Sequence, residues 1–198
     1  MPGIVLIGAQ WGDEGKGKAT DLIGTKVDYV ARFNGGNNAG HTVVVGDESY
    51  AQHLLPSGNF RSGVMNILGN GVALDCENVL KESDTVRQGG VDITPENLLV
   101  SQRASLLLPW HRELDGLEEA RLADKKYGST KQGIAPFYSD KYQKKTVLAG
   151  ELLYPEHLKA HLQDLLEWKN QILREVNGAK GYTMDEMMAW VEQYGQRV

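Results

Sequence analysis

Apolar positions in the first half of the chain fall into short runs, whereas those in the last third repeat with a helical period. Short apolar runs bounded by glycine, proline or polar residues are typical of strands. We therefore expect strands at residues 4–7, 28–33, 65–68 and 97–101. From Pro155 the leucines recur every three or four residues as far as Asn177 and Gly178, which predicts one long helix. Thr183 and Glu186 form a capping box that predicts a second helix.

The apolar runs at residues 42–45 and 49–55 predict a β-hairpin, because a short turn that contains Gly46 separates them. Helical periodicity also predicts helices at residues 18–24, 77–89 and 109–126. The first of these helices stands between the predicted strands at 4–7 and 28–33. Such a strand–helix–strand unit places its two strands parallel, and ligands then gather at the carboxyl ends of the strands.

Segment 8–18 directly follows the first predicted strand and contains four glycines and two lysines. Glycine lets successive backbone N–H groups point at one anion, and the N-terminus of a following helix adds about half a positive charge. Lys16 and Lys18 supply full charges. The segment therefore predicts a phosphate-binding turn and a nucleotide site.

The register of this turn departs from the usual phosphate-loop pattern. Residues 12–18 fit the first part of the Walker pattern, but Ala19 stands where a Ser or Thr hydroxyl would reach magnesium. Either Thr20 supplies that hydroxyl or another ligand is used. Asp13 and Glu14 would repel a phosphate unless one of them binds the metal or takes a proton from the substrate.

Two further loops are rich in glycine and polar residues. Residues 34–41 follow the second predicted strand, where glycine and asparagine tolerate positive φ and leave backbone groups free to meet a ligand. Residues 128–138 form a third such loop, and Lys141, Lys144 and Lys145 follow it closely.

The fold class that these elements predict is α/β. We expect a P-loop NTPase-like, mixed and mostly parallel sheet with an inserted hairpin and helical additions. The 198 residues are enough to bury a sizeable core and show no repeat or low-complexity linker. We expect a single nucleotide-binding domain over 1–198, in which 155–198 is a helical segment.

Composition narrows the class of protein. The hydrophobic content of 41% and the charged content of 24% are ordinary for a globular domain, and a net charge of −5 argues against a general nucleic-acid binder. The single cysteine, Cys76, excludes an intramolecular disulfide and suits a reducing compartment. No apolar stretch approaches membrane-spanning length. We expect a soluble, cytoplasmic protein that binds neither nucleic acid nor membranes.

Four motifs, at residues 8–18, 32–42, 53–58 and 69–72, resemble the adenylosuccinate synthetase family. The resemblance runs over essentially the whole chain. It implies a GTP-dependent ligase that joins IMP and L-aspartate, with magnesium, in the purine biosynthesis of AMP. The family's chains are about twice this length, so the chain resembles an amino-terminal half. The half that recognises guanine and aspartate is absent, which implies that this chain alone is inactive.

The resemblance implies catalytic roles for Asp13, His41 and Lys16. Asp13 matches the base that takes the proton from N1 of IMP, so that the purine oxygen attacks the γ-phosphate of GTP and aspartate displaces the 6-phosphoryl group. His41 matches an acid, which suits an imidazole because its pKa lies near neutrality. Asp13 and the Gly40 carbonyl are implied Mg²⁺ ligands, which fits the missing hydroxyl at Ala19.

The implied nucleotide contacts come mainly from the first two glycine-rich loops. The implied GTP contacts are Gly12, Asp13, Glu14, Gly15, Lys16, Gly17, Lys18, Gly40, His41 and Thr42. The implied IMP contacts are Asp13, Glu14, Gly15, Lys16, Asn38, Ala39, Gly40, His41, Thr130 and Lys144.

One departure from the family falls at the third loop. The family usually has Gly-Thr-Thr-Gly-Arg-Gly-Ile-Gly-Pro-Ala-Tyr where residues 128–138 differ at several positions. An arginine that the family lends across a homodimer interface to the partner's IMP falls on Lys144. Lysine keeps the charge but loses the planar fork, so we expect a homodimer with a weaker contact to the IMP phosphate.

Two other interpretations remain open. The chain could be a non-catalytic purine-nucleotide-binding P-loop module that keeps the phosphate cradle without the ligase reaction. It could also be a fragment that exposes its core where the other half docks, and so aggregates. Nucleotide binding without chemistry in a longer chain would favour the first, and poor solubility would favour the second.

Overall fold

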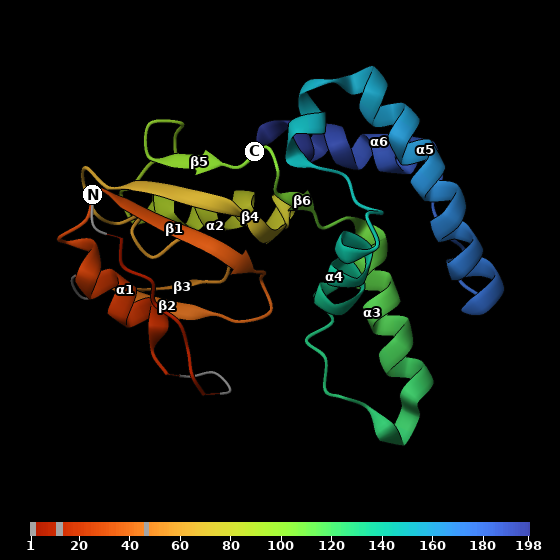
Figure 1. Ribbon diagram of the computed structural model, residues 1–198, viewed down its shortest axis with the longest axis horizontal. Helices are drawn as coiled ribbons and strands as arrows, with labels where there is room; N and C mark the ends of the chain where they lie inside the picture. The colour runs from red at the N-terminus through yellow and green to blue at the C-terminus, as the bar shows by residue number, and fades with distance from the viewer. Residues whose placement is uncertain (1–2, 11–13, 46–47) are drawn as a thin grey trace.

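The computed structural model describes residues 3–10, 14–45 and 48–198. Strands and two helices form an α/β part from the first half of the chain, and helices form a second part beside it (Figure 1). None of the described helices is both long enough and apolar enough to cross a membrane.

The main sheet consists of parallel strands. β4 (Met65–Leu74) lies between β1 (Tyr29–Gly35) and β5 (Leu98–Val100), and the short β6 (Ser105–Leu106) pairs with the far end of β4. β2 (His41–Val45) and β3 (Glu48–Gln52) form an antiparallel hairpin that pairs only with itself among the described strands. The predicted α/β fold with parallel strands and a hairpin is confirmed. The hairpin is not inserted into the sheet to make it mixed, as predicted; among the described strands it forms a second, smaller sheet of its own.

The helices agree with most of the predicted positions. In chain order they are α1 (Lys16–Gly24), α2 (Cys76–Gln88), α3 (Pro109–Leu122), η1 (Ala123–Lys125), α4 (Ile134–Tyr142), η2 (Ala149–Leu153), α5 (Pro155–Gln171), the π turn η3 (Ile172–Val176), α6 (Met184–Gln193) and η4 (Gly195–Arg197). The predicted capping box opens α6, because Thr183 Oγ1 accepts from the Glu186 N–H at 3.2 Å and the Glu186 carboxylate accepts from the Thr183 N–H at 2.7 Å.

Both parts share one apolar core. Buried side chains of β4 and α2 pack in the same cluster as buried side chains of α3, α5 and α6. Members of this cluster are Leu68, Val72, Leu74, Val79, Val86, Trp110, Leu158, Leu162, Leu166, Met187 and Val191. The helical part is therefore packed onto the end of the sheet rather than tethered to it.

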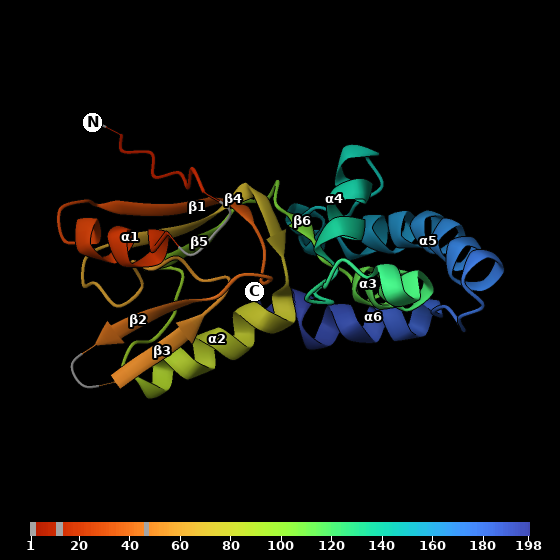
Figure 2. The same cartoon turned by 90° about the horizontal axis from the view of Figure 1, so that it is seen from below.

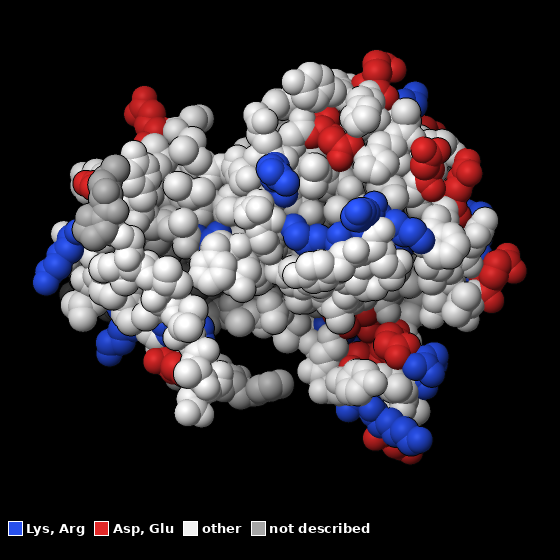
Figure 3. All heavy atoms as spheres, viewed as in Figure 1, with Lys and Arg blue, Asp and Glu red and all other residues white. Residues whose placement is uncertain are grey.

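The two faces of the sheet differ. Helix α1, the hairpin and α2 all lie on one side of it, and the N-terminal tail lies on the other (Figure 2). Tyr29, Phe33 and Leu99 are large apolar side chains of the sheet that are about half exposed. On the side seen in Figure 3, uncharged residues cover the middle of the α/β part, and its charged residues lie mainly around the edge.

The predicted strand at residues 4–7 is wrong. This run pairs with no strand among the described residues, and Ile4, Val5 and Ile7 are 67%, 75% and 71% exposed. A strand needs a neighbouring backbone for its N–H and C=O groups, and here none lies alongside it. The strand–helix–strand unit predicted around segment 8–18 is therefore not formed, and the parallel order of the sheet comes from β1, β4 and β5.

The strand predicted at residues 65–68 is longer than its apolar run, because β4 continues through Gly69 and Gly71 to Leu74. The pairing register of β1 shifts between Arg32 and Asn34, and this brings the Phe33 carbonyl against Gly71. A Cβ on Gly71 would overlap that carbonyl oxygen. These glycines allow two strands to approach closely rather than forming a turn.

The third predicted loop is partly helical, since α4 begins at Ile134 within residues 128–138. Pro136 lies in the first turn of α4, where its missing N–H breaks no helical hydrogen bond. Phe137 is buried and packs with Ala73 and Leu107, so an apolar contact draws this segment into a helix.

Candidate nucleotide site

The first glycine-rich loop leads into α1. Gly15 has a φ of 76° and precedes the first residue of the helix, which is Lys16. The Glu14 carboxylate accepts a hydrogen bond from the Gln10 N–H at 2.9 Å and pairs with the Lys16 ammonium. The hydrogen bond from Lys16 holds the pKa of Glu14 at about 2. In this structure the Lys16 ammonium is thus directed toward Glu14.

The hydroxyl of Thr20, one of the candidates for the missing magnesium ligand, donates back to the Lys16 carbonyl at 2.9 Å. Such a bond is common for a threonine inside a helix. Trp11, Gly12 and Asp13 lie outside the described residues, so the predicted roles of Gly12 and Asp13 stay predictions.

The second glycine-rich loop joins β1 to β2. It turns at Asn37 and Asn38, and residues 38–40 are exposed. The Arg32 guanidinium binds the beginning of this loop. It donates to the Gly36 carbonyl at 2.7 Å and to the carbonyl of His53. Burial lowers the pKa of Arg32, and attraction to Glu82 opposes that effect.

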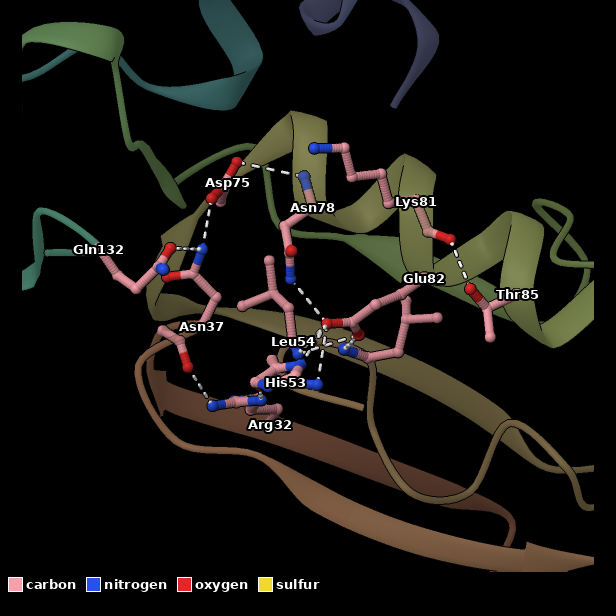
Figure 4. Close-up of polar contacts among 12 residues, drawn as sticks. Arg32, Asn37, His53, Leu54, Asp75, Asn78, Lys81, Glu82, Thr85 and Gln132 are labelled. Carbon is pink, nitrogen blue, oxygen red and sulfur yellow. Dashed lines mark hydrogen bonds and ion pairs between the residues drawn. The ribbon is translucent and has the colours of Figure 1, made fainter. Parts of the chain in front are cut away.

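The buried amide of Asn37 holds the middle of this loop. Its Nδ2 donates to the Asp75 carboxylate at 2.5 Å and to the Gln132 Oε1 at 3.1 Å (Figure 4). Asp75 is also the N-cap of α2, where it accepts from the Asn78 N–H, and it pairs with Arg112 of α3. Burial raises the pKa of Asp75, which Arg112 counteracts. One carboxylate thus joins the loop to α2 and α3.

Tyr138 of α4 ties the loop to the end of β4. Its hydroxyl accepts from the Gly35 N–H at 2.9 Å and donates to the Gly71 carbonyl at 2.8 Å. Burial raises the pKa of this phenol, which keeps it protonated as a donor. The hydroxyl therefore bridges β1 and β4 beside the register shift.

The third loop is organised around Asp115 of α3. Its carboxylate accepts from the Ser129 hydroxyl at 2.6 Å and from the Gly133 N–H at 2.8 Å. Thr130 is exposed between these two anchors. Contact with the second loop comes through Gln132, which reaches Asn37.

Lys144 lies beyond the other end of α4, exposed and with a φ of 61°. Helix α4 has nine residues, which is a length of about 14 Å. The Lys145 N–H donates to the Asp140 carbonyl at 2.9 Å, so Lys144 occupies the left-handed position that ends many helices. The structure therefore separates Lys144 from Thr130 by the length of this helix.

The structure brings most of the predicted nucleotide residues to one region. Helix α1 packs against β2, so the described part of the first loop lies near the end of the second. Glu14, Gly15, Lys16, Lys18, Asn38, Ala39, Gly40 and Thr42 are all exposed there. Gly17 is partly buried, and of His41 only the backbone is described, paired with Gln52 in the hairpin.

Sequence reasoning missed the side chains that hold the second loop, which are Arg32, Asp75, Glu82 and Tyr138. A signal was present for Glu82, because it falls in the apolar stripe of α2 between Val79 and Val86 and is only 6% exposed. A carboxylate at a buried helical position must find donors. It accepts from the N–H groups of His53, Leu54 and Leu55.

Among the residues that the structure describes, no cluster of three histidine, cysteine or acidic side chains could hold a metal ion. The exposed backbone at Gly40 offers a carbonyl, which is the hard oxygen donor that Mg²⁺ prefers. Mg²⁺ in nucleotide sites is usually bound by one or two carboxylates and completes its shell with phosphate oxygens and water. Asp13, the carboxylate predicted for this role, lies outside the described residues, so the Mg²⁺ ligand set stays a prediction.

Comparison with known proteins identifies relatives along the whole chain. A family model described as adenylosuccinate synthetase matches residues 5–198. The adenylosuccinate synthetase of Bifidobacterium adolescentis is 52% identical over 198 residues, and that of Thermobifida fusca is 45% identical over the same length. Each match covers all of this chain and 46% of the relative. The chain thus spans about half the length of the curated relatives it matches.

Two solved structures are similar to this chain over most of its length. The fully ligated adenylosuccinate synthetase from Plasmodium falciparum superposes with a TM-score of 0.82 at 32% identity, covering 95% of this chain and 43% of that one. A cyanophage S-2L succinoaminodeoxyadenylate synthetase bound to dGMP and dATP has a TM-score of 0.55 at 26% identity, covering 80% of this chain and 46% of that one. The loops at residues 8–18 and 34–41 therefore lie in a chain that belongs to the adenylosuccinate synthetase family.

Proposed function

We propose that the chain is the nucleotide-binding half of a GTP-dependent ligase that joins IMP and L-aspartate into adenylosuccinate, with GDP and phosphate as the other products. The observation that carries the proposal is the family match over residues 5–198, together with the two glycine-rich loops whose exposed residues lie in one region. The homologues carry the name of this ligase, and the matched share of their length is 46%.

The chemistry assigned to this half concerns the oxygen of IMP and the γ-phosphate of GTP. Asp13, which lies outside the described residues, takes the proton from N1 of IMP, and the purine oxygen then attacks the γ-phosphorus. Lys16, which pairs with Glu14 in the structure, offers its ammonium to the phosphates. His41 donates to the phosphoryl group or to the oxygen where charge develops. L-Aspartate displaces phosphate from the resulting 6-phosphoryl-IMP.

Residues at the exposed turn of the second loop form the rest of the proposed nucleotide contacts. Asn38 and Ala39 meet IMP, Gly40 meets both nucleotides and Thr42 meets GTP. Thr130 of the third loop meets the IMP phosphate. Backbone groups at an exposed turn suit phosphate and purine oxygens because they need no side-chain reorientation.

Magnesium is the proposed cofactor, held by Asp13 and the Gly40 carbonyl. The metal would neutralise charge on the γ-phosphate of GTP during transfer.

The enzyme is further proposed to be a cytoplasmic homodimer. The exposed position of Lys144, a helix length from Thr130 of its own chain, suits a residue that reaches the IMP site of a partner. A size measurement of the purified protein tests this, since a monomer at working concentration would contradict it.

Guanine and aspartate recognition are assigned to the half that this chain does not contain, so the 198-residue chain alone should not turn over. The test is an assay for adenylosuccinate from IMP, GTP and L-aspartate. Turnover at an ordinary enzymatic rate would overturn this assignment. Titration calorimetry with IMP and with GTP shows separately whether the chain binds nucleotides.

The role of Asp13 is tested in a chain of the full family length. Asp13→Asn should reduce kcat by about 10³-fold, since the amide cannot accept the proton, while the melting temperature stays unchanged. Activity within tenfold of the wild type would remove Asp13 as the base. Nucleotide binding without any chemistry in the wild-type long chain would instead favour a non-catalytic purine-nucleotide module.

A further inference from the structure

Helix α2 directs two buried carboxylates toward the second glycine-rich loop. Asp75 is the N-cap of this helix and Glu82 lies seven residues later, two helical turns and about 10 Å further along. They are 1% and 6% exposed. Figure 4 shows both on the side of the helix that faces Asn37, Arg32 and His53.

Glu82 is bound by backbone donors rather than by a cation. Its carboxylate accepts from the N–H groups of His53 at 2.8 Å, Leu54 at 3.0 Å and Leu55 at 2.9 Å. The Asn78 side chain adds a fourth donor at 2.6 Å. Charge-assisted bonds of this kind are stronger than neutral ones, so the segment that follows β3 is fixed to α2.

Arg32 also binds the backbone of His53, through its carbonyl group. The His53 N–H donates to Glu82, and the His53 carbonyl accepts from the Arg32 guanidinium. The second arm of Arg32 donates to the Gly36 carbonyl at 2.7 Å. The backbone of His53 thus lies between a buried carboxylate and a partly buried guanidinium, and each charge polarises the peptide groups of His53.

The ring of His53 extends this link to the exposed end of the loop. A Cβ placed on Gly40 would lie 2.9 Å from the His53 Nε2, so the Gly40 backbone rests against the imidazole. The Nδ1 of the same ring lies 3.6 Å from Glu82. Moving the backbone of His53 therefore moves both Gly36 and Gly40.

We propose that Glu82 and Arg32 are positioning residues of the nucleotide site, which act through His53 to hold residues 36–40 in the conformation that binds IMP. Asp75 holds the same loop through Asn37, so α2 fixes the loop at two points two turns apart. Neither Glu82 nor Arg32 needs to touch a substrate. The assignment rests on the proposed function, because it gives the loop its ligand.

The test uses Glu82→Gln in the 198-residue chain. The glutamine side chain keeps the size of the carboxylate but turns one acceptor oxygen into a donor, which faces a backbone N–H. Asp84→Asn is the matched control, since Asp84 is an exposed carboxylate on the same helix. Two quantities are measured: the ¹H–¹⁵N shifts of the Gly36 and Gly40 amides without ligand, and the IMP dissociation constant by calorimetry well below the melting temperature.

For Glu82→Gln we expect shifted Gly36 and Gly40 amides and about tenfold weaker IMP binding, while amides in α5 and α6 keep their wild-type shifts. Asp84→Asn should change neither quantity. Unshifted Gly36 and Gly40 amides, or wild-type IMP affinity in a folded Glu82→Gln chain, would overturn the proposal.

A second variant keeps the proposal testable if Glu82→Gln fails to fold. Arg32→Lys retains the charge, but an ammonium lacks the fork that spans two carbonyls, so it should shift the same amides and weaken IMP binding. Wild-type behaviour of this variant would also refute the proposal. If the wild-type chain binds neither IMP nor GTP, the proposed function of the chain fails, and the amide shifts still decide whether Glu82 and Arg32 set the loop.

Discussion

The two glycine-rich loops of the proposed nucleotide site are built in opposite ways. The loop between β1 and β2 is held by the buried Asp75 and Glu82 on α2 and by the partly buried side chains of Arg32, Gln132 and Tyr138. The loop before α1 follows an exposed apolar tail that pairs with no described strand. Its described internal contacts are the exposed Glu14 bonds to Lys16 and Gln10.

This difference shows which loop conformation is held by contacts within the chain and which is not. Buried hydrogen-bond networks rigidify a loop because opening them leaves polar groups unpaired. An exposed ion pair contributes little, since water and salt screen it. We infer that the second loop is preorganised before any nucleotide arrives, and that the first is not.

The largest expected difference in stability between changes at the two loops comes from a pair of glycine substitutions. Gly71→Ala places a Cβ on the Phe33 carbonyl oxygen and forces β1 away from β4 beside the second loop. We expect a loss of about 3 kcal/mol or more in the free energy of unfolding. The melting temperature should fall by about 10 °C.

Gly15→Ala is the matched change in the first loop. Its φ of 76° disfavours alanine, but no atom lies near the added Cβ, so the cost should be only about 1 kcal/mol. Thermal melts of the two variants give the comparison. Equal losses would contradict the claim that only the second loop is tightly packed.

A smaller effect is expected from the Tyr138 bridge. Tyr138→Phe leaves the Gly35 N–H and the Gly71 carbonyl without their partner, which should cost about 1–3 kcal/mol. Tyr142→Phe is the control, because Tyr142 is a highly exposed tyrosine of the same helix. Chemical denaturation measures both. If the two variants lose the same stability, the bridge does not hold the loop.

The smallest expected effect is a loss of stability at acidic pH, caused by His111. His111 is buried under α4, where its Nδ1 accepts from the Leu108 N–H at 2.9 Å and its Nε2 bonds Asp140 at 2.9 Å. Burial lowers the pKa of His111 from the ordinary 6.5, although Asp140 opposes this. Below about pH 6.5 the unfolded chain therefore binds a proton that the folded chain resists, and stability falls as pH falls.

The expected outcome is a melting temperature that drops between pH 7 and pH 5, with a shallower drop in His111→Asn. The Glu14 pKa of about 2 places titration of the first loop's ion pair far below this range. An unchanged slope in His111→Asn would show that another group causes the acid response.

Local sequence patterns predicted the elements whose stability is local. The helices that begin at Pro155 and Met184 follow from a leucine repeat and a capping box, and the hairpin follows from two apolar runs around a short turn. The strand prediction at residues 4–7 was wrong because an apolar run indicates only that a segment is suited to a buried strand. The run does not indicate whether another strand is available to pair with it.

The residues of the site likewise fall into those that local sequence patterns predicted and those that they did not. Glycine and lysine spacing indicated which backbone segments could meet phosphates. Apart from Arg32, the side chains that hold the second loop come from distant positions: Asp75 is 38 residues from Asn37, and Tyr138 is 103 residues from Gly35. Glu82 was the detectable exception, because a carboxylate in an apolar helical stripe calls for buried donors.

The most direct test of unequal preorganisation is native-state hydrogen exchange of the ligand-free chain. The account predicts that the N–H groups of Gly35, His53, Leu54 and Leu55 exchange slowly, close to the amides of β4, because opening them breaks the buried bonds to Tyr138 and Glu82. The N–H groups of Gln10 and Gly15 should exchange near the unprotected rate. Equal protection of the two loops, or slower exchange in the first, would contradict the account.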